Sequence, residues 1–436
     1  MIQTIRKAWG VPELRKKIVF TLLILLIFRI GNAIPVPYIN TTLLGNYLDS
    51  MSGTVLGLYN VMSGGAFAEA TVFALGVQPY INSSIIIQLL TIAIPALERL
   101  ARDGGEAGKK KIASITRYAT VAIALLQGFG YYMICKNYNI LEQQGIWPAL
   151  VIIVSFVAGS SFVMWLGEQV NEFGVGNGIS IILFAGILSR MPNMVTMAAS
   201  YIRTKGSIGY LWIALLIVGM LAMVVLIVHV NEAERRIPVQ YAKRQVGRKM
   251  YGGSSTYLPL KINMSGVIPP IFASSILAIP TLIAQFGKSD QSWVKWINAN
   301  LANTTSVWYI ALYALMIVFF CFFYTSITFN PDETADNMKQ YGGFIPGIRA
   351  GNATSRYLTY VMNRLNTVGA VYLLFVALIP TVLIMALGLN AKLPFGGTTI
   401  LIIAGVGLDT LRQAKAQTEQ FQYTGFLFEN VDHKEG

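Results

Sequence analysis

Charged residues, cysteine and histidine are all scarce in this chain of 436 residues. Only 12% of the residues are charged, which is about half the fraction found in soluble domains, and 54% are hydrophobic. This balance indicates an integral membrane protein. The two cysteines, Cys135 and Cys321, can build neither a disulfide framework nor a zinc cluster, and two histidines are too few for a histidine metal site. We therefore expect no metal ion and no cofactor.

Motifs of catalysis are missing as well. The chain has no Walker A glycine–lysine motif and no HExxH motif. Neither His229 nor His433 adjoins a candidate nucleophile in the sequence. The sequence therefore predicts a protein that is not an enzyme and that has no ATPase of its own.

Long apolar segments dominate what is present. Hydropathy predicts ten membrane spans, of which the fifth and the tenth are weak because their apolar runs are short. The predicted spans cover residues 18–34, 71–97, 112–135, 146–166, 178–197, 210–230, 264–286, 307–329, 367–389 and 397–411. We expect an all-α polytopic membrane protein with ten transmembrane helices.

Lys and Arg residues predict the orientation. With the N-terminus inside, 24 of the 33 fall in predicted cytoplasmic segments and seven in predicted external segments. Basic residues concentrate in the cytoplasmic loops of membrane proteins. The basic arm "MIQTIRKAWGVPELRKK" has no cleavage site after it and should stay inside. We expect a multi-pass protein of a bacterial plasma membrane, with both termini in the cytoplasm.

Ten spans divide into two halves of five, and an odd number per half inverts the second half relative to the first. Corresponding broken spans are the best pointer to the functional centre of such proteins. The second span carries "GVQPYINSS" and the seventh "NMSGVIPPIFASS", while the fifth opens with "GVGNGIS" and the tenth with "FGGTTILII". Close packing through small residues is the alternative for one such span. Four at matching positions favour a central pathway.

This pattern predicts a division into four parts. They are a cytoplasmic amphipathic arm (1–17), an N-terminal half (18–197), a C-terminal half (198–411) with cytoplasmic loops at 231–262 and 330–364, and a cytoplasmic tail (412–436). No carboxylate lies at mid-span, although ion-coupled transporters and proton relays need intramembrane charge. The broken spans offer aliphatic pairs at i,i+4 spacing instead, Val77 with Ile81 and Ile179 with Leu183. Such residues can close a pore by excluding water, but by spacing alone roughly four in five of them would be plain lipid or helix contacts.

The chain resembles the SecY family of protein-conducting channels over essentially its whole length. Besides "GVQPYINSSIIIQLL", the resemblance rests on four stretches in family order and spacing. They are "MWLGEQVNEFGVGNGISIILFAGI" (164–187), "YAKRQVGRKMYGGSSTYLPLKINMSGVIPPIFASS" (241–275), "FNPDETADNMKQYGGFIPGIRAG" (329–351) and "PFGGTTILI" (394–402). The resemblance implies an hourglass of two five-helix halves around a central pore, hinged on one side and opening to lipid on the other.

The resemblance also implies a ring of aliphatic side chains at the waist of the pore. By motif, the ring consists of Val77, Ile81, Ile179, Leu183, Ile271 and Ile402. Many relatives have isoleucine at nearly all six places, so Val77 and Leu183 depart slightly and the ring remains apolar.

Residues 54–70 are too short to cross a membrane and, taken alone, are typical of an interfacial amphipathic helix. By resemblance they form a plug that blocks the external funnel. The implied plug residues are Leu56, Leu58, Tyr59, Asn60, Val61, Met62, Ser63, Gly64 and Gly65. The two glycines permit a chain reversal and a hinge.

In this family the second and seventh helices border a lateral gate. The implied gate residues are Asn82, Ser83, Ser84, Gln88 and Asn263. We expect their side chains to hydrogen-bond across or toward the seam. Such interhelical bonds contribute about 0.6–2 kcal/mol each, which suits a latch that must open.

The loop from Asn231 to Lys261 holds seven basic and two acidic residues. Positive charge near anionic lipid is the simple alternative. By resemblance this loop and the next contact the SecA ATPase or the ribosome, and we expect Arg244, Arg248 and Arg349 to dock these partners. The resemblance further implies SecE-like and SecG-like small membrane subunits, signal peptides and unfolded preproteins as partners. Ribosome docking would involve phosphates without sequence-specific nucleic-acid recognition.

The residues of the sequence leave three candidate functions to be weighed. The favoured one is a passive channel that moves unfolded, signal-peptide-bearing polypeptides across the membrane, releases transmembrane segments sideways into lipid, and is driven by a partner. A small-solute transporter fits the inverted repeat but lacks mid-membrane charge. An intramembrane enzyme needs a nucleophile–base pair or a metal site that the sequence does not offer.

Overall fold

The structure is a computed structural model of the chain. It describes residues 9–50, 54–102, 104–192, 195–196, 199, 202–203, 206–241, 244–246, 249–251, 255–284, 291–386 and 397–429.

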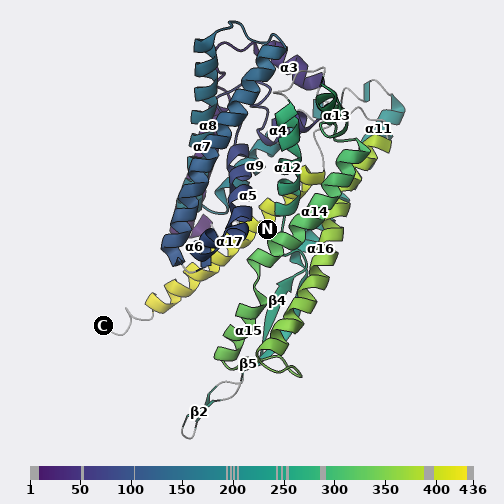
Figure 1. The fold of residues 1–436 in the computed structure, drawn as a ribbon. Helices are drawn as coiled ribbons and strands as arrows, with labels where there is room; N and C mark the ends of the chain where they lie inside the picture. Colours follow the sequence, from purple (N-terminus) through teal and green to yellow (C-terminus); the bar gives the residue numbers. More distant parts are fainter. Residues whose placement is uncertain are drawn as a thin grey trace.

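Helices make up most of the described chain, and most of them run along one long direction (Figure 1). They are α2 (Pro12–Gly31), α3 (Thr41–Ser50), α4 (Val55–Met62), α5 (Gln78–Ala93), α6 (Pro95–Arg102), α7 (Gly105–Asn137), α8 (Ile146–Phe173), α9 (Gly178–Leu188), α11 (Ser207–Glu232), α12 (Ile268–Ala284), α13 (Ser292–Asn300), α14 (Val307–Thr328), α15 (Pro331–Gln340), α16 (Asn352–Ala386) and α17 (Gly397–Glu429). Each of the ten predicted spans falls on one of these helices: α2, α5, α7, α8, α9, α11, α12, α14, α16 and α17.

The helices differ in their capacity to cross a membrane. Among the described residues, α7, α8, α11, α14 and α16 are long and apolar enough on their own. α5 and α6 together form a sixth candidate span, broken by a bend of 105°. α9 and α12 are apolar but shorter. Three of the four spans predicted to be broken or short, α5, α9 and α12, therefore depart from a full-length helix, whereas α17 is a continuous helix of 33 residues.

Glycines explain where three of these irregular helices begin. Gly76, Gly176 and Gly266 have φ angles of 52°, 87° and 61°, a left-handed conformation that side chains other than glycine rarely adopt. Each glycine shortly precedes the helix start of α5, α9 or α12. Backbone without helical hydrogen bonds at membrane depth is tolerated only where protein or a cavity surrounds it.

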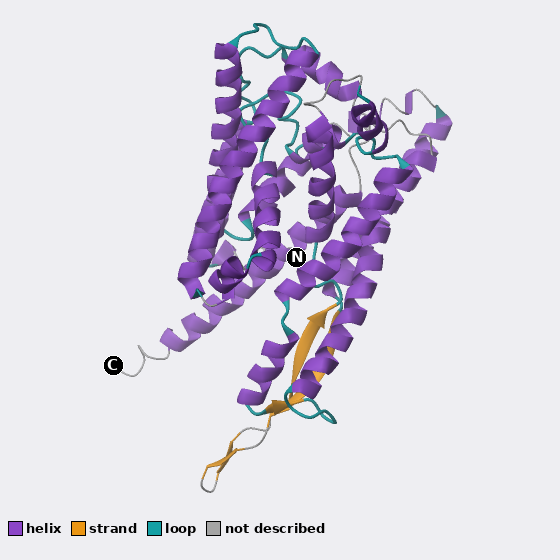
Figure 2. Ribbon diagram, viewed as in Figure 1, coloured by secondary structure: helices purple, strands orange, loops and turns teal. Residues whose placement is uncertain are grey.

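In the described part of the chain, the strands lie at one end of the molecule, here named the sheet end (Figure 2). β1 (Glu234–Tyr241) pairs with β4 (Ser255–Lys261) and with β5 (Gly343–Phe344), both antiparallel. β2 (Arg244–Val246) and β3 (Lys249–Tyr251) form a second hairpin that projects from this end. The opposite end, which carries α3 and α13, is named the far end (Figure 1).

Two regions hold most of the buried apolar residues. The larger cluster draws on α2, α5, α8, α9, α11, α12, α14, α16 and α17, and so on both predicted halves. A smaller cluster joins α3 to α7 and α8. Around the sheet, Ile237, Val239, Leu260, Met338, Ile345 and Leu358 form a separate core, which unites the two loops predicted at 231–262 and 330–364.

Candidate functional site

All six predicted ring residues, here named the waist residues, lie in the larger apolar cluster. Five are buried, namely Val77, Ile81, Leu183, Ile271 and Ile402, and Ile179 is partly buried and packs against the cluster. They come from four helices, α5, α9, α12 and α17, and each lies at the N-cap or within the first six residues of its helix. The starts of these four helices therefore all contribute to the larger apolar cluster.

The chemistry of this waist is purely aliphatic. Its side chains have no hydrogen-bonding groups, so they can neither bind an ion nor hold a water molecule in place. An apolar constriction of this kind blocks ions by dewetting. Four separate helices contribute to it.

A cavity of about 580 Å³ opens beside the waist, toward the sheet end. Its lining comes from α9, α11, α12, α14 and α17 and includes Asn177, Asn231, Asn263, Tyr324, Thr410 and Arg412. Val267 and Val406 line the cavity and also belong to the apolar cluster of the waist. The cavity is therefore a vestibule of mixed polar and apolar lining that adjoins the apolar cluster containing the waist residues.

The predicted plug contains the short helix α4, which reaches the same apolar cluster through Tyr59 and Met62. The Gln78 Nε2 atom donates to Met62 Sδ at 3.1 Å, and Asn32 Nδ2 donates to the Ser63 carbonyl at 3.3 Å. Gln78 is the first residue of α5, so the plug is tied directly to the start of a helix that carries waist residues. The side chain of Leu58, another predicted plug residue, lies outside the described part of the chain.

The C-terminal end of the plug rests on the end of α9, at a surface here named the plug seat (Gly186 and Ser189). The Ser189 hydroxyl donates to the Gly186 carbonyl at 2.6 Å, and its oxygen lies 3.5 Å from the Gly64 carbonyl oxygen. A Cβ atom at Gly186 would lie 2.6 Å from the Met62 carbonyl oxygen, so only glycine fits there. Gly64 and Gly65 have φ angles of 71° and 96°, which gives the chain reversal expected of them.

The other end of the plug contacts the second half of the chain. Thr54, directly before α4, forms an isolated antiparallel bridge with Asn303, which lies between α13 and α14. α4 also packs against α12. The plug is thus held at its start by the predicted C-terminal half and at its end by α9 of the predicted N-terminal half. A separation of the two halves would pull on both ends.

Several polar atoms around the plug are buried without a hydrogen bond to any described residue. They are Asn32 Oδ1, the Tyr59 hydroxyl, Gln78 Oε1 and Asn82 Oδ1. Burial raises the pKa of the Tyr59 hydroxyl; neighbouring Asn82 partly offsets this, although the two groups do not complete a good hydrogen bond. An unsatisfied buried polar group costs about 1–3 kcal/mol, so this region is held less firmly than it could be.

The two helices of the predicted gate, α5 and α12, pack against each other. Three of the predicted gate residues of α5, Ser83, Ser84 and Gln88, bond within that helix, whereas Asn82 Oδ1 has no partner among the described residues. Ser83 Oγ donates to the Pro79 carbonyl at 2.8 Å, and Gln88 Nε2 donates to Ser84 Oγ at 3.1 Å. We expected these side chains to bond across the seam, but these bonds lie on one side of it. In a low-dielectric surrounding, the nearest partner is a carbonyl or hydroxyl one turn away in the same helix.

Asn263, the fifth predicted gate residue, instead belongs to a polar network inside the predicted C-terminal half. Asn263 Nδ2 donates to Asn231 Oδ1 and to the Gly266 carbonyl, both at 3.1 Å, and Ser265 donates to Asn263 Oδ1 at 3.2 Å. The Arg412 guanidinium donates to the Asn231 carbonyl at 2.8 Å. These bonds tie the segment before α12 to α11 and α17.

The same network continues away from the vestibule. Ser265 Oγ lies 3.4 Å from Cys321 Sγ, which lies 3.8 Å from the Asn366 carbonyl. Thr325 Oγ1 bonds Asn366 Oδ1 at 2.7 Å, and Thr325 and Asn366 are almost fully buried. We name the whole set the C-half network; it consists of Asn231, Asn263, Ser265, Cys321, Thr325, Asn366 and Arg412. Apart from Asn263, the sequence analysis did not identify these residues, although a buried asparagine within a span is itself a signal.

The predicted docking residues lie at the sheet end. Arg349 is exposed in the loop between β5 and α16. Arg244 lies on β2, and its side chain, like the whole of Arg248, lies outside the described residues. Because β1 of one loop pairs with β5 of the other, the two loops form one folded unit rather than two independent segments.

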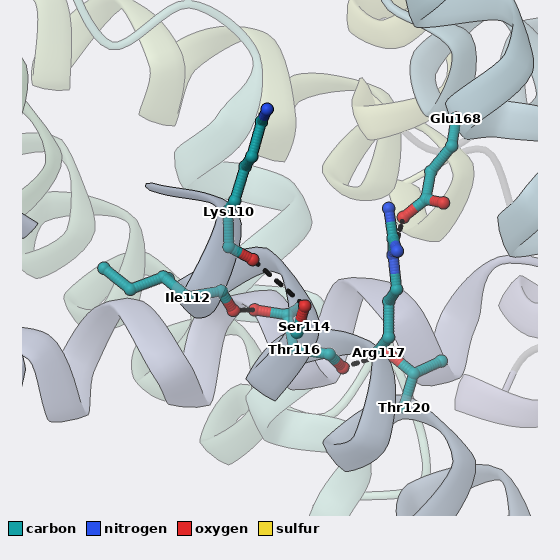
Figure 3. A network of polar contacts seen from close by, with 7 residues as sticks. All are labelled: Lys110, Ile112, Ser114, Thr116, Arg117, Thr120 and Glu168. Atoms are coloured by element: carbon teal, nitrogen blue, oxygen red, sulfur yellow. Dashed lines mark hydrogen bonds and ion pairs between the residues drawn. The ribbon is translucent and has the colours of Figure 1, made fainter. Parts of the chain in front are cut away.

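An ion pair between neighbouring helices was not predicted either. Arg117 Nε on α7 lies 2.7 Å from Glu168 Oε1 on α8 (Figure 3). Close by on α7, the hydroxyls of Ser114, Thr116 and Thr120 each donate to the carbonyl four residues earlier. The sequence analysis placed Arg117 within a span, and the ion pair supplies the partner that a charge in that position needs.

Comparison with known proteins agrees with this arrangement. The SecY family matches residues 71–411. The protein translocase subunit SecY of Streptomyces coelicolor is 48% identical, with 98% of this chain and 100% of the relative covered. Among solved structures, a protein-conducting channel shares 17% identity at a TM-score of 0.62, covering 92% of this chain and 91% of its own. Sec61 in the canine ribosome–channel complex from the endoplasmic reticulum shares 16% identity at a TM-score of 0.57, covering 92% and 91%.

The structural matches are too distant in sequence to show more than a common fold. They confirm the predicted fold class, a polytopic helical membrane protein. The sequence matches cover most of the chain at high identity and agree with the resemblance carried by the motifs around the waist. The chain belongs to the SecY family.

Proposed function

We propose that the chain is the central subunit of a protein-conducting channel. It would move unfolded, signal-peptide-bearing polypeptides across a membrane and release transmembrane segments sideways into lipid. The observation that carries this proposal is that the six aliphatic waist residues, from the starts of four separate helices, belong to one apolar cluster next to the vestibule. A passive polypeptide channel needs such a pair, a wide entrance and a narrow apolar seal that binds nothing.

The resting seal has two parts in this proposal. The waist residues block ions, and the plug supports them on the far side through Tyr59 and Met62. The gate residues border the seam between α5 and α12, where a signal peptide would enter. Their hydrogen bonds within one helix leave the seam to apolar contacts, which a signal peptide can replace with its own apolar side chains.

The division into an N-terminal half (18–197) and a C-terminal half (198–411) belongs to the same proposal. The halves would separate at the seam and remain joined elsewhere. The plug supports this division, because its start contacts Asn303 and its end contacts Ser189, so it bridges the two halves.

Energy for transport would come from partners. We propose a SecA-type ATPase or a translating ribosome as the source, with no enzymatic activity in this chain itself, and SecE-like and SecG-like small subunits as membrane partners. The membrane would be a bacterial plasma membrane, with both termini and the sheet end in the cytoplasm. The excess of Lys and Arg in the predicted cytoplasmic segments supports this orientation.

Docking of the motor would involve Arg244, Arg248 and Arg349. Arg349 is exposed on a loop that is continuous with the folded unit of the sheet end, so a force applied there reaches α14 and α16 through α15 and the start of α16. We predict that Arg349→Glu blocks motor-driven transport but leaves membrane insertion and partner assembly intact. Transport assays and co-purification measure the two effects, and Arg356→Glu on the neighbouring turn is the control for a charge change alone. Loss of assembly would make Arg349 a structural residue.

The decisive experiment is protease protection of a preprotein in liposomes. The liposomes contain the chain, its SecE-like partner, a cognate SecA and ATP. Full-length protected preprotein that requires both its signal peptide and ATP would establish the channel. No protection, with a correctly assembled complex and an active motor, would favour the alternative of a small-solute transporter.

A further inference from the structure

The short helix α13 at the far end is amphipathic, and it exposes large apolar side chains where a helix in water would expose polar ones. The two tryptophans, Trp293 and Trp296, occupy one arc with Asn300 between them, Lys295 and Asn298 lie opposite this arc, and Ile297 and Val294 lie between the two. Val294 is buried against the protein, with 2% of its surface exposed. Trp293 and Trp296 are 44% and 50% exposed. Two large indole rings therefore project outward beside the face that packs on the protein.

The depth of α13 is fixed by its neighbour α14. Trp308 is the second residue of this long apolar span, and its ring lies 6.4 Å from that of Trp296. Two further spans that begin at the same end also start with an exposed aromatic residue, Trp147 on α8 and Tyr210 on α11. Tryptophan and tyrosine concentrate at this level of membrane proteins, because their rings are apolar and their N–H or O–H groups remain hydrated.

We propose that α13 is an interfacial helix that lies in the lipid headgroup layer at the far end and inserts Trp293 and Trp296 among the outer lipid chains. The occupant of its exposed face is the membrane surface itself. Lys295 and Asn298, on the opposite arc, would face water or lipid phosphates.

This position gives α13 a role in the gate, a step that rests on the proposed function. α13 packs against both α12 and α14, and Asn303, which follows it, pairs with Thr54 at the start of the plug. A helix held in the headgroup layer would keep the far end of α12 and the start of the plug at constant depth. Gate opening would then leave the far end of α12 at the same depth in the membrane.

Site-directed spin labelling tests the depth directly. Cysteine is introduced one position at a time in the full chain within its assembled complex, as Trp293→Cys, Trp296→Cys, Lys295→Cys or Asn298→Cys. The two natural cysteines are buried, so the unmodified chain measures background labelling. The complex is placed in vesicles of phosphatidylcholine and phosphatidylglycerol. Collisions of the label with oxygen, which dissolves in lipid, are compared with collisions with a water-soluble nickel chelate.

We expect a several-fold higher oxygen-to-nickel ratio at positions 293 and 296 than at 295 and 298. Equal ratios at all four positions would place α13 in water and overturn the proposal. Low accessibility to both reagents at 293 and 296 would mean that a protein partner covers this face, which would also overturn it. The measurement does not require transport, so its failure and the failure of the proposed channel function are distinguishable.

A second measurement keeps the native aromatic rings. The tryptophan fluorescence of the unmodified chain is compared with that of the double variant Trp293→Phe/Trp296→Phe in vesicles whose lipids carry bromine near the headgroup. We expect bromine to quench less tryptophan fluorescence in the double variant than in the unmodified chain, because two of the quenched rings are absent. An equal amount of quenched fluorescence in both would contradict the insertion of these rings.

Discussion

The two helices that meet at the proposed gate, α5 and α12, begin alike but are held differently. Each follows a glycine of positive φ and has proline in its first turn. Around the start of α5, four buried polar atoms have no hydrogen bond to a described residue. Before α12, Asn263 satisfies its side chain within the C-half network. The start of α5 with its plug is therefore the part suited to move, whereas the start of α12 is fastened to its own half.

This difference has an energetic meaning. A buried polar group without a partner costs about 1–3 kcal/mol, so the closed arrangement of the plug keeps a free-energy penalty that opening can relieve. A satisfied network penalises any movement of its members, because each broken bond leaves a buried group unpaired. We therefore expect gating to displace the plug and α5 before it disturbs α12.

The largest effect is expected at the waist. Ile81→Gly on α5 removes an apolar side chain that is 6% exposed, so water and ions should enter the resting pore. Deletion of residues 56–65 removes the plug and should act in the same direction. Ion conductance of the reconstituted complex in planar bilayers measures both. Ile86→Gly on the same helix is the control, since Ile86 is 37% exposed and loses the same side chain outside the apolar cluster. Equal conductance of the Ile81 variant and the unmodified channel would contradict the seal.

A smaller leak is expected from the plug seat. In Gly186→Ala the new methyl group would lie 2.6 Å from the Met62 carbonyl oxygen, so the end of the plug must shift. The channel should open more often at rest, with a mean conductance between those of the unmodified chain and the Ile81 variant. Gly219→Ala on α11 is the matched control, because nothing lies within 4 Å of its added Cβ atom. A Gly186 variant as tight as the control would mean that the plug does not depend on this seat.

The same substitution at one asparagine near the start of each helix tests whether the starts of α5 and α12 are held differently. Asn82 and Asn263 are buried to the same degree, 5% and 6% exposed, but only Asn263 has its amide fully engaged. Asn263→Leu should lower the free energy of unfolding by about 1–3 kcal/mol, because Asn231 and Ser265 lose their partner. Asn82→Leu should be close to neutral or stabilising, because it removes an unsatisfied oxygen.

Thermal and denaturant unfolding of the purified complex in detergent measures both changes. If Asn82→Leu destabilises the complex as much as Asn263→Leu does, the starts of α5 and α12 are not held differently. An Asn82 variant that is more stable and has a lower resting conductance would show that the unsatisfied oxygen favours plug opening.

The sequence predicted the helices better than it predicted their contacts. Hydrophobic runs are local, so each of the ten predicted spans corresponds to a helix, and glycine and proline located the breaks. The waist residues came from i,i+4 pairs and from the family resemblance, and the structure brings them into one cluster. Their roles in sealing remain predictions.

Hydrogen-bond partners were beyond local reasoning. The bond from Arg412 to Asn231 joins residues 181 positions apart, and no local pattern indicates such a pair. The polar residues of α5 were identified, but the bonds of Ser83, Ser84 and Gln88 proved to lie in the same helix rather than across the seam. A polar side chain in an apolar segment shows that a partner must exist, and only the fold determines which one.

The smallest expected effect is on the free energy of unfolding, when either of two polar contacts between neighbouring helices is removed. The ion pair Arg117–Glu168 joins α7 to α8, and its side chains are 52% and 24% exposed. Thr325 and Asn366 join α14 to α16 through a neutral bond in a fully buried place. Exposed ion pairs contribute only about 0.2–1 kcal/mol because solvent and salt screen them. Interhelical bonds between neutral side chains in membrane proteins average about 0.6 kcal/mol and reach about 1.7 kcal/mol.

Double-mutant cycles on unfolding stability compare the two links, with Arg117→Gln and Glu168→Gln in one cycle and Thr325→Val and Asn366→Leu in the other. We expect the coupling energy of the charged pair to be the smaller one and to fall further as salt is added, while the neutral pair is unaffected by salt. A charged pair that couples more strongly and ignores salt would mean that lipid shields Arg117 and Glu168 from water. The N-terminal half would then be held by a rigid link of its own, and the contrast between a movable α5 side and a fastened α12 side would have to be confined to the plug and the start of α5.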